Sequence, residues 1–228
     1  MDLEEILNIQ RKERHHRKNP DHGFKGQYKQ DRYVYDNFFA GQKNGTFLDI
    51  GAHEGISLNN TFFFEKVLGW KGICFEPNPD VFSMLKLNRA AICLPIALSD
   101  VEGIAEFTKI TGYSQTLSGL TKEYHPNYTD RIKEEAEEFK CDAEIINVKT
   151  RTLNSVLEEY NFTNIDFMSL DTEGSELKVL AGLDFNKFAV RVITMENNYD
   201  SQDHRLFMKE RGYYLKERIA IDDIYVKA

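Results

Sequence analysis

The sequence has few cysteines and no long hydrophobic run. Its three cysteines, Cys74, Cys93 and Cys141, are odd in number and widely spaced, so they indicate neither a disulfide framework nor a C-x-x-C zinc site. No stretch approaches the roughly 18 apolar residues that a membrane-spanning helix needs, and the N-terminal segment is too charged for a signal peptide. We therefore expect a soluble, cytoplasmic protein without a membrane partner.

The sequence also lacks an excess of positive charge. Its formal net charge is −8 at pH 7 and its pI is about 5.3, which disfavours general electrostatic binding to nucleic acid or to an anionic membrane. The exception is a basic cluster at 11–18, which we interpret as part of a solvated N-terminal arm over residues 1–29. Nucleic acid is therefore not an expected partner, and residues 30–228 are expected to form a single folded domain.

Apolar runs alternate with helix-like segments along the chain, without an internal repeat. This order is typical of parallel strands joined by crossover helices, the doubly wound class of α/β fold. The last two apolar runs, at 213–218 and 222–226, lie too close together for a crossover helix, so they should pair antiparallel. The other predicted strands are 46–50, 72–76, 92–97, 165–170 and 190–196, and the predicted helices are 58–68, 79–89, 152–160, 175–181 and 202–211.

Residues 103–150 differ in character from the rest of the chain. They contain a hairpin-like run at 104–110, a polar segment at 112–120 and an acidic segment at 133–140. We interpret them as an insertion over the carboxyl edge of the sheet, where such segments often form lids or substrate walls. A surface excursion without a functional role is the alternative. If the insertion is a substrate wall, Tyr113, Ser114 and Gln115 are candidates for contacts to a polar substrate.

The most informative motif is the run from 47 to 55, in which a short apolar strand ends beside Asp49 and is followed by Gly51 and Gly55. Glycine permits tight turns and close approach of a ligand to the main chain, and a following helix offers unpaired N–H groups to an anion. The pattern D-x-G-x-x-x-G predicts a nucleotide-type ligand, although a purely structural turn can use the same residues. It lacks the third glycine of the dinucleotide-binding pattern, because Ile56 and Ser57 stand there.

Acidic residues lie at or just after the ends of several predicted strands. Ligands bind outside the carboxyl ends of the strands in open α/β sheets. One crevice should therefore contain Asp49, Glu76, Asp100, Asp171 and Glu196. Glu76 ends the second predicted strand and is placed to accept hydrogen bonds from both hydroxyls of a ribose, with helix capping as the alternative role.

Asp171 and Glu173 follow the fourth long predicted strand and precede a helix. They either complement the dipole of that helix or lie beside the reacting atom as general base or substrate clamp. Together with Glu196 they could also converge on a hard cation such as Mg²⁺, but oxygen-ligand sites have no reliable spacing signature, so no metal site is assigned. His53 and His125 have no spaced partner acid and are interpreted as polar loop residues, although His53 is placed to meet a ligand's carboxylate or amine.

Taken together, the motifs resemble the FkbM family of S-adenosylmethionine-dependent methyltransferases. The resemblance covers about residues 30–228. It rests on the glycine motif at 47–55, the Phe-Glu-Pro-Asn-Pro run at 75–79, the Ala-Leu-Ser-Asp run at 97–100 with Gly103, the long motif at 165–180, and the strand that closes on Glu196. The chain departs from the family pattern at His53, where asparagine is frequent, and at Thr172, where valine is usual.

The resemblance implies a Rossmann-like class I methyltransferase fold, with a mostly parallel seven-stranded sheet and a C-terminal antiparallel hairpin. It also implies S-adenosylmethionine as cofactor and methyl transfer to a hydroxyl of a sugar, a glycan or another small natural product. By position, Asp49, Gly51, His53 and Gly55 would surround the methionine part of the cofactor, Glu76 the ribose, and Ser99 with Asp100 the adenine. Asp171 and Glu173 would lie beside the acceptor.

Three alternatives stay open at this point. A nicotinamide-dependent oxidoreductase would need the missing third glycine. A nucleotide-binding module without catalysis would keep the crevice but not the substrate wall. An RNA methyltransferase would use the basic cluster at 11–18, but the sequence lacks the Asn/Asp-Pro-Pro-aromatic run associated with methylation of base amines. The acceptor, the metal requirement and the oligomeric state are not predicted.

Overall fold

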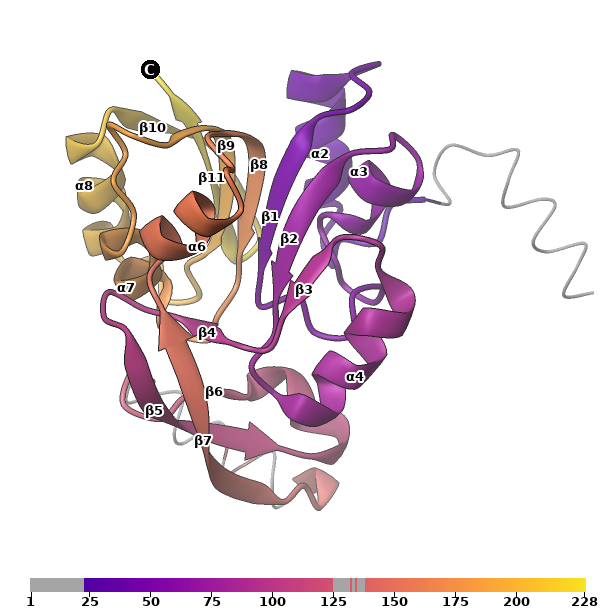
Figure 1. Cartoon of the computed structure of the whole chain (residues 1–228), viewed down its shortest axis with the longest axis vertical. Coiled ribbons are helices and arrows are strands. Elements are labelled where there is room, and N and C mark those ends of the chain that lie inside the picture. The colour runs from indigo at the N-terminus through magenta and orange to yellow at the C-terminus, as the bar shows by residue number, and fades with distance from the viewer. Residues whose placement is uncertain (1–22, 125–131, 133, 135–137) are drawn as a thin grey trace, which may run out of the picture.

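A seven-stranded sheet forms the centre of the protein in the computed structural model, which describes residues 23–124, 132, 134 and 138–228 (Figure 1). The strand order is β10-β11-β9-β8-β1-β2-β3. Neighbouring strands from β3 to β9 are parallel, whereas β11 runs antiparallel to both β9 and β10. The strands are β1 (Thr46–Ile50), β2 (Lys71–Phe75), β3 (Ile92–Leu94), β8 (Asn164–Leu170), β9 (Ala189–Glu196), β10 (Tyr213–Ile219) and β11 (Asp222–Lys227). This arrangement confirms the predicted fold.

Helices cover both faces of the sheet, which explains the nearly continuous apolar runs of the central strands. Phe47 and Leu48 in β1 are both fully buried, and they belong to the two different hydrophobic clusters on opposite faces. Figure 1 shows one group of helices on each side. One group contains α2 (Gln30–Val34), η2 (Tyr35–Phe39), α3 (Phe62–Lys66) and α4 (Pro79–Asn88), and the other contains α6 (Leu153–Glu159), α7 (Glu176–Ala181) and α8 (Gln202–Glu210).

Two predicted elements are shorter than expected. The predicted helix at 58–68 forms only over α3, because the side chains of Asn59 and Thr61 bind the end of β1 and hold the preceding residues in a loop. The predicted strand at 92–97 is interrupted at Pro95, which has no N–H to donate to a ladder. Its first part is β3, and its last residues belong to β4 (Ala97–Leu98) in a different sheet.

A second sheet of four strands, in the order β4-β7-β5-β6, is formed mainly by the predicted insertion. Its long strands β5 (Gly103–Ile110) and β7 (Ala143–Arg151) pair antiparallel, and β5 also pairs with β6 (Gly119–Leu120) after the 3-10 segment η3 (Gly112–Leu117). Figure 1 shows this second sheet at the end of the main sheet where β1 and β2 point. The insertion thus lies over the carboxyl edge of the main sheet, and its role as a lid or substrate wall stays a prediction. Half of the acidic segment at 133–140, namely residues 133 and 135–137, lies outside the described residues, as does His125.

The described part of the predicted arm, residues 23–29, packs on the domain. Main-chain N–H groups of Lys25 and Gly26 donate to the buried carboxylate of Asp31, and Gly26 forms a parallel bridge with Leu58. Part of the segment that was predicted to be a solvated arm is therefore packed against the folded domain. The basic cluster at 11–18 lies outside the described residues. Among the described helices, none combines the length and the apolar character that crossing a membrane requires.

Candidate active site

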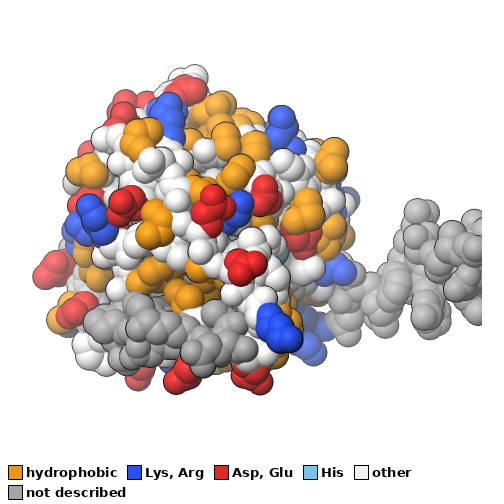
Figure 2. Space-filling model, turned by 90° about the horizontal axis from the view of Figure 1, so that it is seen from below, with side chains coloured by type: hydrophobic (Ala, Val, Ile, Leu, Met, Phe, Trp, Pro, Cys, Tyr) orange, Lys and Arg blue, Asp and Glu red, His pale blue; other side chains and the backbone are white. Residues whose placement is uncertain are grey.

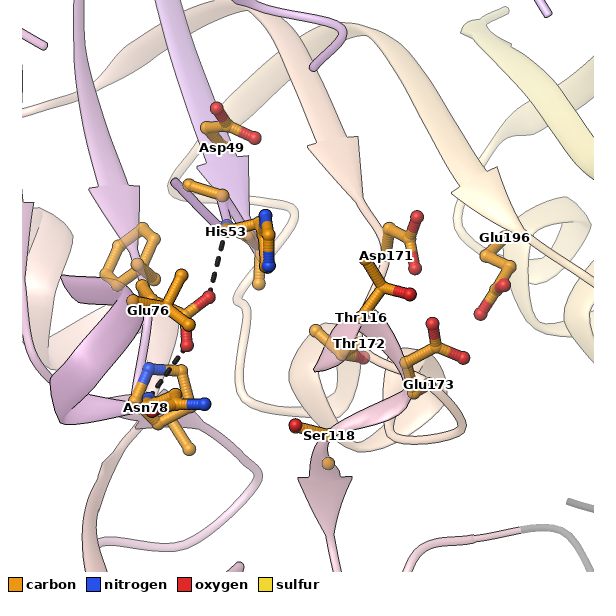
Figure 3. Close-up of a pocket in the computed structure, with 18 of the residues that line it drawn as sticks. Asp49, His53, Glu76, Asn78, Thr116, Ser118, Asp171, Thr172, Glu173 and Glu196 are labelled. Carbon is orange, nitrogen blue, oxygen red and sulfur yellow. Dashed lines mark hydrogen bonds between the residues drawn. The ribbon is translucent and has the colours of Figure 1, made fainter. Parts of the chain in front are cut away.

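A cavity of about 220 Å³ lies between the carboxyl ends of the main-sheet strands and the second sheet. Side chains from β1, β2, β8 and β9 face it from one side, and Thr116 and Ser118 face it from the insertion (Figure 3). The predicted site residues Asp49, Gly51, His53, Glu76, Asp171, Glu173 and Glu196 all line this cavity. Gly55, Ser99 and Asp100 are not among the lining residues. The binding roles assigned to these residues remain predictions.

The loop at 51–55, called the glycine loop here, begins with a tight turn after β1. Gly51 has a φ of +83°, and the main-chain N–H groups of Gly51 and Ala52 both donate to the carbonyl oxygen of Phe75 at the end of β2. A Cβ atom on Gly51 would lie 1.7 Å from the carbonyl oxygen of Asp171. Gly51 therefore lets the ends of β1 and β8 approach each other. Gly55 has a φ of +84° and packs on Arg89 behind the loop, which explains its absence from the cavity wall.

A buried ionic network, which the sequence analysis missed, holds the glycine loop from behind. Arg89 is 5% exposed, and its guanidinium lies 3.1 Å from Asp49 Oδ2 and 2.6 Å from Glu65 Oε2. The same Asp49 oxygen accepts hydrogen bonds from Asn59 Nδ2 (2.8 Å) and Thr61 Oγ1 (2.7 Å). Asp49 Oδ2 thus has a structural role, because it holds these three side chains together. Arg89 stands in no recognisable motif, and its partners are up to 40 residues away in sequence, so no local signal could have found it.

Glu76 is held rigidly at the edge of the cavity. Its Oε1 accepts the main-chain N–H of Asn78 (2.7 Å), and its Oε2 accepts the main-chain N–H of His53 (3.1 Å). The side chain is 6% exposed, and burial raises its pKa to about 7 although the two hydrogen bonds oppose this shift. Burial also lowers the pKa of His53, whose Nε2 has no hydrogen-bond partner. Glu76 therefore joins the glycine loop to the turn after β2.

Asp171, Glu173 and Glu196, called the carboxylate cluster here, face one another at the opposite side of the cavity (Figure 3). One carboxylate oxygen from each lies within 4.8 Å of the others, so the predicted convergence occurs and this set has the oxygen ligands that a hard cation prefers. Burial raises the pKa of Glu196 well above its usual range, and repulsion from Asp171 adds to this effect. Solvent reaches Asp171 through the cavity, yet its withdrawal from bulk water, with repulsion from Asp222, raises its pKa to about 8.

Glu176 takes the structural role that the sequence analysis left open for Asp171 and Glu173. Its Oε1 accepts hydrogen bonds from the main-chain N–H and the hydroxyl of Thr172, both at 2.9 Å, and from the N–H of Gly174 at 3.2 Å. Glu176 therefore stabilises the turn that leads into α7. Asp171 and Glu173 are left to face the cavity, which favours the functional interpretation of these two residues.

The end of the cavity nearest the second sheet is apolar. Ser99 is 6% exposed and donates to Asp100, which forms an ion pair with Lys178 at 3.2 Å. The residues that line the cavity there are instead the apolar side chains of Val81, Ile96, Leu98, Phe107 and Leu117. These apolar side chains form a wall against which a flat ring can pack, and the adenine-binding role of Ser99 and Asp100 stays a prediction.

Comparisons with known proteins agree with this geometry. The model of the methyltransferase FkbM domain matches residues 49–215, which is most of the chain. The chain belongs to the FkbM methyltransferase family. It is 29% identical over 168 residues to methyltransferase sdnD of Sordaria araneosa, covering 62% of this chain and 61% of that protein. The chain thus spans about three fifths of that relative's length, and the predicted family is confirmed.

A solved structure shares the fold of this FkbM-family chain. The crystal structure of methyltransferase FkbM from Methylobacillus flagellatus KT matches with a TM-score of 0.50 at 12% sequence identity. The match covers 91% of this chain and 50% of that one. At this low identity the likeness concerns the fold alone.

The raised carboxylate pKa values of this FkbM-family site predict a stability that falls with pH. Between pH 6.5 and 8 the unfolded chain has already lost its carboxyl protons, whereas folded Glu76, Asp171 and Glu196 still hold part of theirs. The folded state then binds more protons, so the free energy of unfolding decreases as pH rises. His53 and His204 act in the opposite direction, because burial lowers their pKa values and the unfolded chain then holds more of their protons near pH 6.5. Two histidines do not outweigh the three carboxyl groups. We expect the melting temperature of the ligand-free protein to fall by roughly 2–4 °C from pH 6.5 to 8.

Thermal denaturation of the ligand-free protein across this pH range measures the effect. Glu196→Gln removes one of the buried ionisable groups and should flatten the profile. A melting temperature that stays constant or rises towards pH 8 in the unsubstituted protein would contradict the assignment of the raised pKa values.

Proposed function

We propose that this chain is an S-adenosylmethionine-dependent methyltransferase that methylates a hydroxyl group of a sugar, a glycan or another small natural product. The observation that carries the proposal is Glu76, a 6% exposed carboxylate fixed by two main-chain N–H groups beside the glycine loop. A carboxylate held in this way can accept hydrogen bonds from the ribose of a nucleoside ligand. Membership of the FkbM family supports S-adenosylmethionine as that ligand, since it is the typical methyl donor of such enzymes.

The side of the cavity that contains the glycine loop, called the glycine-loop half here, has residues that fit this cofactor. Gly51 leaves the main chain open at the end of β1, and the unpartnered Nε2 of His53 offers a hydrogen bond to the polar methionine end. The apolar wall that includes Leu98 and Phe107 offers a surface for a base. When bound, S-adenosylmethionine supplies an electrophilic methyl group on a sulfonium.

The carboxylate cluster and the insertion provide the acceptor half. Asp171 follows β8 and lines the cavity, and Thr116 and Ser118 face it from the insertion (Figure 3), which supports an acceptor site between them. Alignment of the acceptor oxygen with the methyl group contributes much of the rate in such a displacement. A sugar hydroxyl is a weak nucleophile, so we assign Asp171 as the group that takes its proton and Glu173 as a residue that holds the acceptor.

We do not include nucleic acid among the proposed acceptors. The cytoplasmic location stays a prediction. Seen from the end that carries the second sheet, basic side chains appear as separate spots between acidic and hydrophobic ones (Figure 2). Binding to a polyanion is driven by clustered Lys and Arg side chains. This face of the described residues therefore favours a small or uncharged acceptor.

Titration calorimetry with S-adenosylmethionine and, separately, with NAD tests the proposal. We expect S-adenosylmethionine to bind and Glu76→Gln to weaken its binding at least tenfold, because a charge-assisted hydrogen bond to a ribose hydroxyl contributes about 1.5–3 kcal/mol. Glu106→Gln, an exposed position on β5 outside the cavity, is the matched control and should bind normally. Binding of NAD in preference to S-adenosylmethionine would favour the oxidoreductase alternative.

Cofactor binding must then be followed by turnover. Incubation with methyl-labelled S-adenosylmethionine and a panel of glycosides and other hydroxylated compounds should transfer label to at least one acceptor. Tight cofactor binding without transfer to any hydroxylated acceptor would favour the non-catalytic nucleotide-binding module instead.

A further inference from the structure

Asn78 has a buried amide group that the fold itself does not satisfy. The residue is 1% exposed, lines the cavity, and its Nδ2 has no hydrogen-bond partner. Most buried polar groups in folded proteins have a partner, and an unpaired buried donor destabilises the protein. The sequence analysis included Asn78 only in the Phe-Glu-Pro-Asn-Pro run at 75–79, so this donor has no assigned function so far.

The orientation of the amide is fixed by its neighbours. Asn78 is the N-cap residue of α4, and its Oδ1 accepts the main-chain N–H of Asp80 at 3.2 Å. Its own main-chain N–H donates to Glu76, and its carbonyl oxygen accepts from Phe82. Exchanging the amide oxygen and nitrogen would leave the N–H of Asp80 without its cap. The NH₂ group must therefore be the one that faces the cavity, as Figure 3 shows.

Glu76 and Asn78 together present an acceptor and a donor side by side. The carboxylate of Glu76 accepts hydrogen bonds, and the unpartnered NH₂ group of Asn78, which lines the same cavity, is available to donate them. A hydroxyl group is the simplest ligand group that matches both, because it donates one hydrogen bond and accepts others. A ring that carries two neighbouring hydroxyls matches this pair better than a flat base, for which the apolar wall offers a packing surface.

We propose that the Asn78 side-chain NH₂ donates a hydrogen bond to a ribose hydroxyl oxygen of the bound cofactor, so that Glu76 and Asn78 recognise the same sugar. This inference rests on the proposed function. It makes Asn78 a specificity-determining residue that favours ribonucleoside over deoxyribonucleoside ligands. It also explains why a polar side chain with an unsatisfied donor occupies a position that is almost fully covered.

The test compares the binding affinities of modified ligands for the unsubstituted protein and for a variant, as in a double-mutant cycle. S-Adenosylhomocysteine and its 2′-deoxy and 3′-deoxy forms are titrated by calorimetry into the unsubstituted protein and into Asn78→Ser. Serine also caps helices, so this variant removes the amide NH₂ and leaves only a shorter hydroxyl, while it keeps the start of α4. Should Asn78→Ser melt at a lower temperature, Asn78→Asp is the second variant, because it keeps both the shape and the cap and lacks the donor.

We expect Asn78→Ser to bind S-adenosylhomocysteine about tenfold more weakly. The unsubstituted protein should lose about the same factor for one of the two deoxy forms, and Asn78→Ser should show little further loss for that form. The inference is overturned if Asn78→Ser binds the parent ligand normally, or if its loss is equal for the parent and both deoxy forms. Failure of the unsubstituted protein to bind S-adenosylmethionine or S-adenosylhomocysteine at all would instead overturn the proposed function.

Discussion

Replacing Gly51 by alanine is expected to destabilise the protein by about 3–5 kcal/mol and to abolish cofactor binding. An alanine Cβ would stand 1.7 Å from the carbonyl oxygen of Asp171, which is main chain and cannot rotate away. The substitution also places a side chain at a φ of +83°. The left-handed conformation costs roughly 1–2 kcal/mol and overpacking roughly 1–3 kcal/mol or more. Urea denaturation followed by fluorescence measures the stability, and calorimetry measures the binding.

Gly41 provides the matched control for this prediction. Its φ is +78°, nearly the same as that of Gly51, but no atom lies within 4 Å of a Cβ built there. Gly41→Ala therefore carries the conformational cost without the collision and should destabilise the protein by only about 1–2 kcal/mol. Equal losses for Gly41→Ala and Gly51→Ala would show that the contact between β1 and β8 does not require glycine.

Replacing Asp171 by asparagine should lower turnover by a factor of about 10² to 10⁴ while changing cofactor affinity only slightly. Loss of a positioned general base has this magnitude, and asparagine keeps the size of the side chain. Because the pKa of Asp171 is raised to about 8, the ionised base becomes more abundant as pH increases through this value. Turnover of the unsubstituted enzyme should rise over the same range, and the residual turnover of Asp171→Asn should not.

Kinetics with an acceptor identified in the labelling screen provide this measurement. Asp166→Asn is a suitable control, since Asp166 lies in the same strand but outside the cavity, where it binds Thr46 and Arg191. It should leave turnover nearly unchanged. If Asp171→Asn weakens cofactor binding in proportion to turnover, Asp171 contacts the cofactor and does not act as the base.

Those parts of the fold that depend on local patterns could be predicted from sequence. The central strands are buried on both faces, so their apolar runs are nearly continuous, as at Phe47 and Leu48. The acids that end these strands meet in one cavity because parallel strands present their carboxyl ends together. Glu76, Asp171 and Glu196 were found in this way.

Features that depend on contacts between distant residues could not be predicted. In the sequence, Arg89 is only the last residue of a predicted helix. In the structure it binds Asp49, Glu65 and Thr61. These contacts help to hold the residues before α3 in a loop. The different roles of the three acids after β8 could not be predicted either. Local sequence does not show that Glu176, and neither Asp171 nor Glu173, accepts the hydrogen bonds of the turn. The free amide of Asn78 becomes visible only when the partner of its oxygen is known.

The two halves of the cavity differ in how freely they can evolve. The glycine-loop half is tied to the core through Arg89 and through the close contact at Gly51, so most substitutions there would damage the whole domain. The insertion contributes Thr116 from η3 and Ser118 from the residue that follows η3, beside a separate small sheet with its own hydrophobic cluster. Substitutions at Thr116 and Ser118 can therefore change the acceptor while the donor site stays intact, which gives the fold a constant cofactor and an adjustable substrate range. Leu98 and Phe107 of the second sheet are excepted, because they belong to the wall proposed for the base.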